Sequence, residues 1–272
     1  MSNYIGVCHI HSTHSSDGDL TIAEIARFFR ERRYHFVCLT EHSSKPDGSF
    51  IGEDKMKEMR EECRAASSDS FVVIPGLECE TDSGVHILAI GVTQPIESRN
   101  YLEVIDAIKL QGGIAVLAHP FFFERKYPQE LMEQLDGIEI WNGGKVPVPD
   151  ASACFMLQKL HRKGITPLAY FGLDFHRQEQ YKPLCMIVSA DELSVSGVVQ
   201  ALKSGNYLLR SPEYEITPFA DFPKHKLIQW YLYERFFFSS RRWAVKLKNK
   251  LDEKGIKIPE KATAAIRRFY FN

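Results

Sequence analysis

Short apolar segments alternate with helical segments from residue 4 to residue 211, and this alternation constrains the fold more than any other feature. Strands are predicted at residues 4–10, 35–40, 71–78, 85–92, 114–119, 137–142, 166–174, 183–190 and 206–211. Helices are predicted at residues 21–33, 53–66, 101–112, 151–164 and 194–204. Such alternation is typical of parallel βαβ units, and continuous apolar runs suit strands covered on both faces. We therefore predict a closed or nearly closed α/β barrel, with an open doubly wound sheet as the alternative.

The composition is ordinary for a globular protein with a large core, since 44% of the 272 residues are hydrophobic and 25% are charged. We expect no membrane-spanning helix, because no run of about 18 apolar residues occurs. The opening MSNYIGVCHIH has neither the basic nor the apolar region of a secretory signal. The six cysteines form no CxxC pair, and most lie in apolar strand-like runs, so a reducing, cytoplasmic location is predicted.

Residues 222–272 differ from the rest of the chain in charge. They hold 13 Lys or Arg and 4 Asp or Glu, whereas residues 1–221 hold 21 Lys or Arg and 31 Asp or Glu. A charge contrast of this size indicates two pieces with different partners. We therefore predict a domain at residues 1–221 and a basic C-terminal extension at residues 222–272.

The extension has the pattern of a basic amphipathic helix or helical pair. Trp243, Leu247 and Leu251 recur every four residues beside basic side chains, and Gly255 and Pro259 are expected to interrupt the helix. One interpretation is a helix that packs on its own barrel with its cations facing solvent. The other is contact with nucleic acid or with an anionic membrane surface.

Histidines and carboxylates fall at the ends of the predicted strands. They are His9, His11, His42, Glu78, His119, Asp174 and His176. Side chains alternate along an extended strand, so His9 and His11 face the same way and can converge on one metal ion. The strands of a parallel barrel all end on one face, and that face carries the active site. His86 fits this pattern less well, because it stands at the beginning of its own predicted strand.

These residues belong to motifs that, taken in chain order, resemble the PHP (polymerase and histidinol phosphatase) family. The motifs are His9-Ile10-His11, Ser16-Asp17-Gly18, Leu39-Thr40-Glu41-His42, Pro75-Gly76-Leu77-Glu78, HILAIG (86–91), Ala118-His119-Pro120 and Asp174-Phe175-His176, with GIEIWNGG (137–144) before the last. The match covers residues 1 to about 212. The resemblance implies a distorted (β/α)₇ barrel that binds two or three divalent metal ions.

The resemblance also implies a set of metal ligands at matching positions. The first ion would be held by His9, His11, Glu78 and Asp174; the second by Glu78, His86 and His119; and the third by Asp17, His42 and His176. Asp174 and His176 are also assigned catalytic roles. Two positions depart from the pattern: Glu41 stands where the family commonly has Asp, and His14 is an alternative to Asp17.

The donor types agree with this implication. Nitrogen and oxygen ligands without thiolate suit Mn²⁺, Fe²⁺ or Zn²⁺. A bridging carboxylate holds two ions roughly 3.5–4 Å apart, which suits attack on phosphorus by a metal-bridged hydroxide. No GxSxG, GxxxxGK[ST] or GxGxxG motif occurs. Arg177 and Lys145 are expected near the barrel mouth as substrate-phosphate ligands, the alternative being ordinary solvated charges.

We therefore predict a metal-dependent phosphoric ester hydrolase whose substrate is a phosphomonoester or phosphodiester, either a small phosphorylated metabolite or a nucleotide. A nuclease guided by the basic extension is the second hypothesis, and a non-catalytic binding module with structural metals is the third. For His9 and His11 the alternative interpretation is a solvated histidine-rich loop, and the presence of the other motifs disfavours that interpretation. The histidines outside any motif are His14, His35, His161 and His225.

Overall fold

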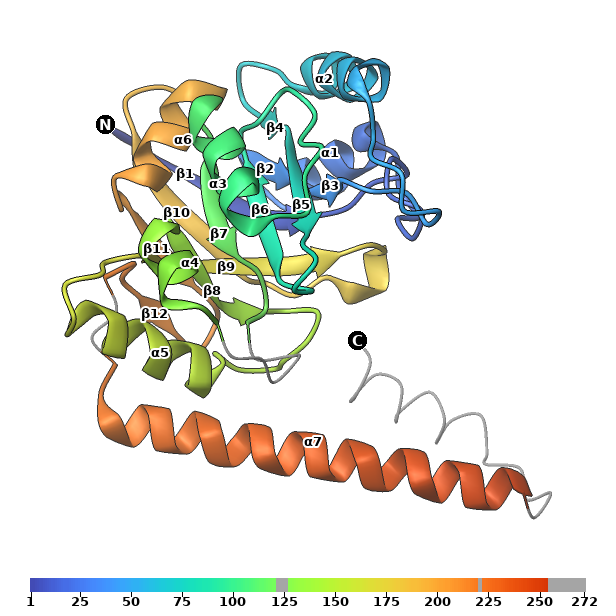
Figure 1. Ribbon diagram of the computed structural model, residues 1–272, viewed down its shortest axis with the longest axis vertical. Helices are drawn as coiled ribbons and strands as arrows, with labels where there is room; N and C mark the ends of the chain where they lie inside the picture. Colours follow the sequence, from blue (N-terminus) through green and yellow to red (C-terminus); the bar gives the residue numbers. More distant parts are fainter. Residues whose placement is uncertain (121–126, 220–221, 254–272) are drawn as a thin grey trace.

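The computed structural model describes residues 1–120, 127–219 and 222–253 (Figure 1). Its strands are β1 (Ser2–Ile10), β2 (Phe36–Leu39), β3 (Glu41–His42), β4 (Val72–Ile74), β5 (Gly76–Glu80), β6 (His86–Ile90), β7 (Ile114–Leu117), β8 (Gly137–Asn142), β9 (Leu168–Phe175), β10 (Cys185–Ala190), β11 (Tyr207–Arg210) and β12 (Glu215–Ile216). Its helices are α1 (Ile22–Glu31), α2 (Glu53–Ala66), α3 (Tyr101–Leu110), α4 (Gln129–Gln134), α5 (Ala151–His161), α6 (Val195–Lys203) and α7 (Lys224–Glu253), with a 3₁₀ turn η1 (Gln178–Gln180). The predicted strands and helices are present, while β12, α4 and η1 were not predicted from the apolar pattern.

A closed ring of seven strands forms the barrel. β1 pairs in parallel with β2 on one side and with β9 on the other. β2 and β3 are one strand interrupted at Thr40, β4 and β5 are one strand interrupted at Pro75, and these two strands pair in parallel. The ring continues through β6, β7 and β8 and closes at β9. The prediction of a distorted (β/α)₇ barrel is confirmed, and the open sheet is excluded.

Strand β6 runs antiparallel to both of its neighbours, which corrects the prediction of parallel βαβ units throughout. The reason is the short link between β5 and β6, where the amide of Thr81 donates to the carbonyl of Val85 at 2.9 Å. A parallel crossover needs about a dozen residues or more, so this link permits only a hairpin. The reversal pairs His86 with Glu80 and places the beginning of β6 where the parallel strands end. Outside the ring, β10 pairs antiparallel with β1 and extends the sheet through β11 and β12.

The core beneath the strand ends is apolar and closely packed. The predicted capping box is present at α1: the Thr21 side chain accepts from the Glu24 amide, and the Glu24 carboxylate accepts from the Thr21 amide. This cap starts a helix whose apolar face is fully buried, and its Phe29 ring meets Phe175 of β9 with centroids 5.4 Å apart. Phe175 directly follows Asp174, so the packing of α1 supports the strand end that carries a predicted ligand.

Helix α7 extends well past the barrel (Figure 1). Its first half packs against α5 and buries Leu227, Trp230 and Phe237. Trp243 and Leu247, from the predicted apolar repeat, are 65% and 39% exposed, so that repeat does not face the barrel. The predicted interruption at 255–259 lies outside the described residues. Among the helices described, none has the length and apolarity to cross a membrane.

Candidate metal centre

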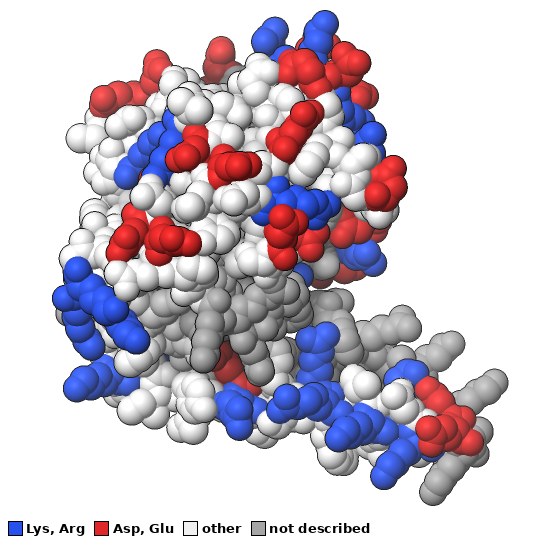
Figure 2. Space-filling model, in the orientation of Figure 1, with Lys and Arg blue, Asp and Glu red and all other residues white. Residues whose placement is uncertain are grey.

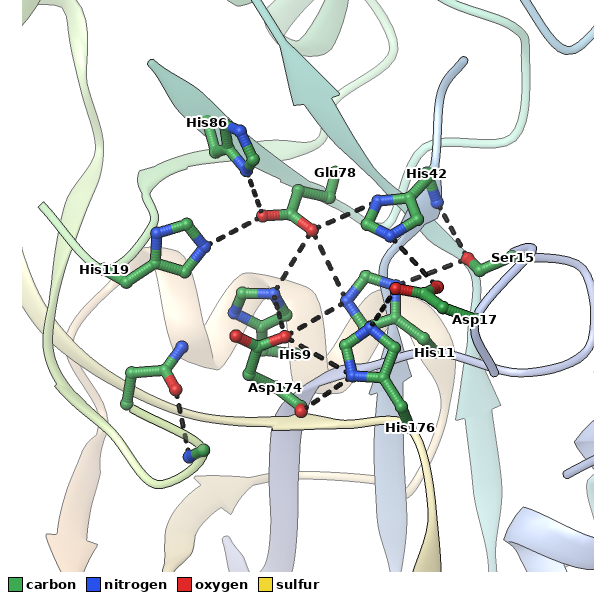
Figure 3. Close-up of polar contacts among 12 residues, drawn as sticks. His9, His11, Ser15, Asp17, His42, Glu78, His86, His119, Asp174 and His176 are labelled. Carbon is green, nitrogen blue, oxygen red and sulfur yellow. Dashed lines mark hydrogen bonds and ion pairs between the residues drawn. The ribbon is translucent and has the colours of Figure 1, made fainter. Parts of the chain in front are cut away.

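The nine predicted ligands lie together at the end of the barrel where the parallel strands finish (Figure 3). Five of them lie on strands: His9 on β1, His42 on β3, Glu78 on β5, His86 on β6 and Asp174 on β9. The other four lie in the segments that follow β1 (His11, Asp17), β7 (His119) and β9 (His176). His9, His119 and Asp174 have φ angles of 63°, 27° and 50°. Positive φ is uncommon for residues other than glycine, and such strain gathers at functional sites.

Two imidazoles and two carboxylates form the buried centre of this cluster. His9 Nε2 lies 3.5 Å from Glu78 Oε2 and 3.6 Å from Asp174 Oδ1. His11 Nε2 lies 3.4 Å and 3.8 Å from the same two oxygens. Both Nε2 atoms are buried, and among the described residues neither makes a hydrogen bond. The four side chains therefore direct their nitrogen and oxygen atoms into one small volume.

These separations fit a metal ion. Two ligands bound to one ion at about 2.0–2.2 Å lie roughly 3.0–3.6 Å apart, close to the distances between the imidazoles and the carboxylates here. Among the described residues, three groups with ligand atoms within 4.8 Å of one another could hold an ion: His11, His42 and His176; His9, His11 and Asp174; His9, Glu78 and His119. The donors are nitrogen and oxygen, whereas the six cysteines are free thiols elsewhere in the fold.

The two oxygens of Glu78 face different partners. Oε2 is directed at His9, His11 and, at 3.4 Å, Nδ1 of His42. Oε1 is 2.8 Å from Nδ1 of His86 and 3.1 Å from Nε2 of His119. This division is the one that a carboxylate bridging two ions requires, and the antiparallel β6 is what brings His86 to it.

Asp17 lies between the two histidines predicted to share an ion with it. Its oxygens are 3.3 Å from His42 Nε2 and 3.2 Å from His176 Nε2. Hydrogen bonds from His176 and His42 hold the pKa of Asp17 well below its usual range. Burial lowers the pKa of His42, but Asp17 and Glu78 outweigh it and raise that pKa to about 10. His14 instead contacts Glu62 of α2 at 3.2 Å, so it is Asp17 that stands beside His42 and His176.

The electrostatics at the centre are those of a cation site. Burial opposes ionisation of Glu78, but His9 and the other neighbouring imidazoles hold its pKa well below the usual value. Burial lowers the pKa of His11 well below its ordinary value, which leaves that imidazole neutral. For His9, the charges of Glu139 and Asp174 outweigh burial and raise the pKa. Ionised carboxylates thus share a buried site with imidazoles, and perturbed groups of this kind mark functional sites.

No protein-family model matches the sequence, and no curated protein matches it. The fold does match solved structures. A two-domain protein from Bacteroides vulgatus, containing a predicted PHP-like metal-dependent phosphoesterase, has a TM-score of 0.60 and 21% identity, with 86% of this chain and 70% of that chain covered. The chain has the PHP-domain fold. PsfC from Pseudomonas syringae shares it with a TM-score of 0.53 and 14% identity, over 86% of this chain and 99% of that one. The lesion-specific endonuclease Q of Pyrococcus furiosus has a TM-score of 0.54 and 14% identity, over 80% of this chain and 60% of its own.

A buried glutamate that the sequence motifs did not single out supports this cluster of candidate ligands. Glu139 of β8 is 1% exposed and lies 2.9 Å from His9 Nδ1. Its other oxygen accepts from the amide of His119 at 2.7 Å and from Asn142 Nδ2 at 2.9 Å. By accepting a hydrogen bond from Nδ1–H of His9, Glu139 would leave the Nε2 atom of that imidazole available to an ion. The available signal was a lone glutamate inside the apolar strand GIEIWN, since a buried charge needs partners.

Gly172 of β9 makes room for this arrangement. A Cβ at residue 172 would overlap the carboxylate of Glu139 and crowd the Cβ of His9. The position therefore requires glycine because two functional side chains pass close to its backbone.

Glu41 has a comparable supporting role in the loop that follows β1. Its carboxylate accepts from the amide of Ser12 and, at 2.6 Å, from the hydroxyl of Ser15. Ser15 Oγ also lies 3.3 Å from His11 Nδ1 and accepts from the amide of His42. Glu41 thus fixes the loop between His11 and His42 through Ser12 and Ser15.

The two cations predicted for substrate phosphate lie at the mouth of the site. Lys145 is 70% covered, and its Nζ is 2.6 Å from Asp174 Oδ2. Burial lowers the pKa of Lys145, but Asp174 outweighs it and raises that pKa above the ordinary value. Arg177 is more exposed and faces Asp19 at 3.7 Å. Both line a cavity of about 180 Å³ together with Asp17, Asp174 and His176.

Proposed function

We propose that the chain is a metal-dependent phosphoesterase that hydrolyses a phosphomonoester or phosphodiester of a small phosphorylated metabolite or nucleotide. The observation that carries this proposal is the buried cluster of His9, His11, Glu78 and Asp174, with unbonded imidazole nitrogens aimed at carboxylates at one end of a PHP-type barrel. Two buried imidazole nitrogens that have no hydrogen bond and face two carboxylates form an arrangement that a bound cation would complete.

The donor set suits two or three Mn²⁺, Fe²⁺ or Zn²⁺ ions. His9, His11, Glu78 and Asp174 would hold the first; Glu78, His86 and His119 the second; Asp17, His42 and His176 the third. When bound, such ions act as Lewis acids on phosphoryl oxygens and lower the pKa of water. The Glu139 carboxylate keeps the His9 proton on Nδ1, and the Asp174 carbonyl does the same for His176 at 2.9 Å.

The charged side chains around the centre have separate tasks. Asp174 turns Oδ1 toward the imidazoles and Oδ2 toward Lys145, so the ammonium group is held beside the cluster. A phosphoryl oxygen that enters the cavity there would bind Lys145 by a charge-assisted hydrogen bond, with Arg177 also lining the cavity. Asp174 and His176, which touch both the cluster and this cavity, are the residues we assign to catalysis.

The test is metal analysis of purified protein combined with turnover of phosphorylated sugars, nucleotides and short oligonucleotides. We expect two or three metal equivalents, and loss of turnover in His9→Ala and Asp174→Ala. His225→Ala, an exposed histidine on α7, is the matched control and should retain both metal and activity. Protein that binds no Mn²⁺, Fe²⁺ or Zn²⁺ and hydrolyses none of these substrates would contradict the proposal.

A nuclease is the second candidate, and helix α7 is the observation that favours it. Figure 2 shows Lys and Arg side chains along α7, and the similar structures include a lesion-specific endonuclease. Neutralising phosphates releases counterions, so oligonucleotide cleavage would fall steeply as salt rises. Turnover of a small phosphomonoester would fall much less. Equal salt dependence for the two substrates would argue against the nuclease.

A further inference from the structure

A cavity of about 620 Å³ connects the metal centre with helix α7. His119 and Lys145 line it at the barrel end. The residues of α7 that line it lie three or four positions apart, as one face of a helix requires, and include Tyr231, Arg235, Phe238, Arg242 and Lys246. From Tyr231 to Lys246 this face is roughly 22 Å long at 1.5 Å per residue. The cavity is therefore an elongated groove that begins at a predicted metal ligand.

Three cations on this face are available to a ligand. Arg235, Arg242 and Lys246 are exposed, and within the described residues no carboxylate lies within ion-pair distance of them. Lys248, further along the same helix, is instead paired with Asp252 at 2.6 Å. Figure 2 shows the blue side chains following α7 beneath the barrel. Unpaired cations along a groove attract and orient anionic ligands.

The acidic residues that line the groove are Glu139, Asp150 and Glu234, and each has partners within the protein. Asp150 accepts from the amide of Ala153 at 2.9 Å at the start of α5. Glu139 is already bonded to His9, His119 and Asn142. Glu234 is buried beside Asp150, and burial followed by that neighbouring charge raises its pKa to about 9. It is therefore uncharged near neutral pH, and its Oε1 accepts from the amide of Ala151.

The same face also carries aromatic rings. Tyr231 and Phe238 line the groove on the same helix face as the cations, Tyr231 before Arg235 and Phe238 between Arg235 and Arg242 along the chain. Cations interleaved with aromatic rings bind ligands that combine phosphate groups with flat or apolar units. The volume is within the range of sites for small molecules and is too small for a long duplex.

We propose that α7 forms a second anion subsite of the active site, which rests on the phosphoesterase function proposed above. The reacting phosphoryl group would lie at the metal centre, and a further phosphate of the same substrate would bind Arg235, Arg242 or Lys246 across the groove. A small bisphosphorylated metabolite and a short oligonucleotide both have this chemistry. The preferred substrate is thus a compound with more than one phosphate.

The kinetic test compares substrates with one and with several phosphates on the full-length, metal-loaded protein. The probes are fructose 6-phosphate, fructose 1,6-bisphosphate and a 5′-phosphorylated tetranucleotide. We expect Arg235→Gln/Arg242→Gln to lower kcat/KM for a multiply phosphorylated probe, relative to the monophosphate, by roughly tenfold, as loss of charge-assisted contacts implies. Lys248→Gln, outside the groove on the same helix, should leave that ratio unchanged. If the kcat/KM ratio falls only for the bisphosphate, the substrate is a small bisphosphorylated metabolite. If it falls only for the tetranucleotide, the substrate is an oligonucleotide.

A binding measurement separates this inference from the proposed function. Calorimetric titration with inorganic tripolyphosphate requires no turnover, and we expect Arg235→Gln/Arg242→Gln to weaken its binding roughly tenfold relative to wild type and to Lys248→Gln. If the protein hydrolyses no phosphoester but the variant still binds tripolyphosphate more weakly than wild type, only the proposed phosphoesterase function is refuted. Unchanged substrate ratios together with unchanged tripolyphosphate binding would overturn the subsite.

Discussion

Replacing Glu139 by glutamine tests whether Glu139 sets the position of the His9 proton in the candidate metal centre. Glu139 accepts hydrogen bonds on both oxygens, from His9 on one side and from His119 and Asn142 on the other. A glutamine has one accepting oxygen, and two donors on the His119 side favour placing it there. Its NH₂ group would then face His9 Nδ1 and force the proton of that imidazole to Nε2. The proton would occupy the atom that lies 3.5 Å from Glu78 and 3.6 Å from Asp174.

The expected loss follows from these contacts. A hydrogen bond to a charged group contributes about 1.5–3 kcal/mol, and loss of such a supporting partner weakens metal binding by roughly 10–100-fold. The assay is competition for Mn²⁺ or Zn²⁺ against a chromophoric chelator, with thermal unfolding to confirm the fold. Glu133→Gln, on the exposed face of α4, is the matched control. Metal affinity in Glu139→Gln equal to that of wild type would refute the role of Glu139 in setting the His9 proton.

Three further changes have defined outcomes. Asp17→Asn should reduce bound metal by one equivalent while the others remain, because it removes the charge shared by His42 and His176; elemental analysis checks this, and unchanged stoichiometry would count against a third ion. Gly172→Ala should lower metal content and destabilise the fold by about 1–3 kcal/mol through overpacking, seen as a lower unfolding temperature, whereas Gly52→Ala, with open space around it, should not. For Glu234, a pKa raised from 4.5 to about 9 means that the folded state holds a proton that the unfolded state releases, so wild-type stability falls as pH rises across that window. Glu234→Gln should therefore gain in unfolding temperature over wild type from pH 5 to pH 9, and a constant difference would show that Glu234 does not titrate there.

The sequence was sufficient to predict most elements of the barrel but not the direction of one strand. Apolar runs bounded by turns mark strands whatever their orientation, so β6 was predicted as one more parallel strand. Its reversal depends on the short link from Thr81 to Val85. That reversal is also why His86, although it stands at the start of a strand, lies 2.8 Å from Glu78.

Supporting residues and helix packing were harder to predict for a physical reason. The ligand positions have local signals, because histidines and carboxylates at strand ends form motifs. Glu139 belongs to no such motif. Its supporting role depends on contacts with His9 and His119, which are distant in sequence and are brought to it by the fold. Likewise, periodicity predicted a helix in the extension but not which face packs, since Trp230 is buried while Trp243 is exposed.

The most direct measurement is anomalous diffraction from crystals of the full chain soaked in Mn²⁺ or Zn²⁺. We predict a peak about 2.0–2.3 Å from Nε2 of both His9 and His11 and from oxygens of Glu78 and Asp174. A second peak is expected on the Oε1 side of Glu78, between His86 and His119. No anomalous peak within this cluster at saturating metal would contradict the claim that it is a metal centre.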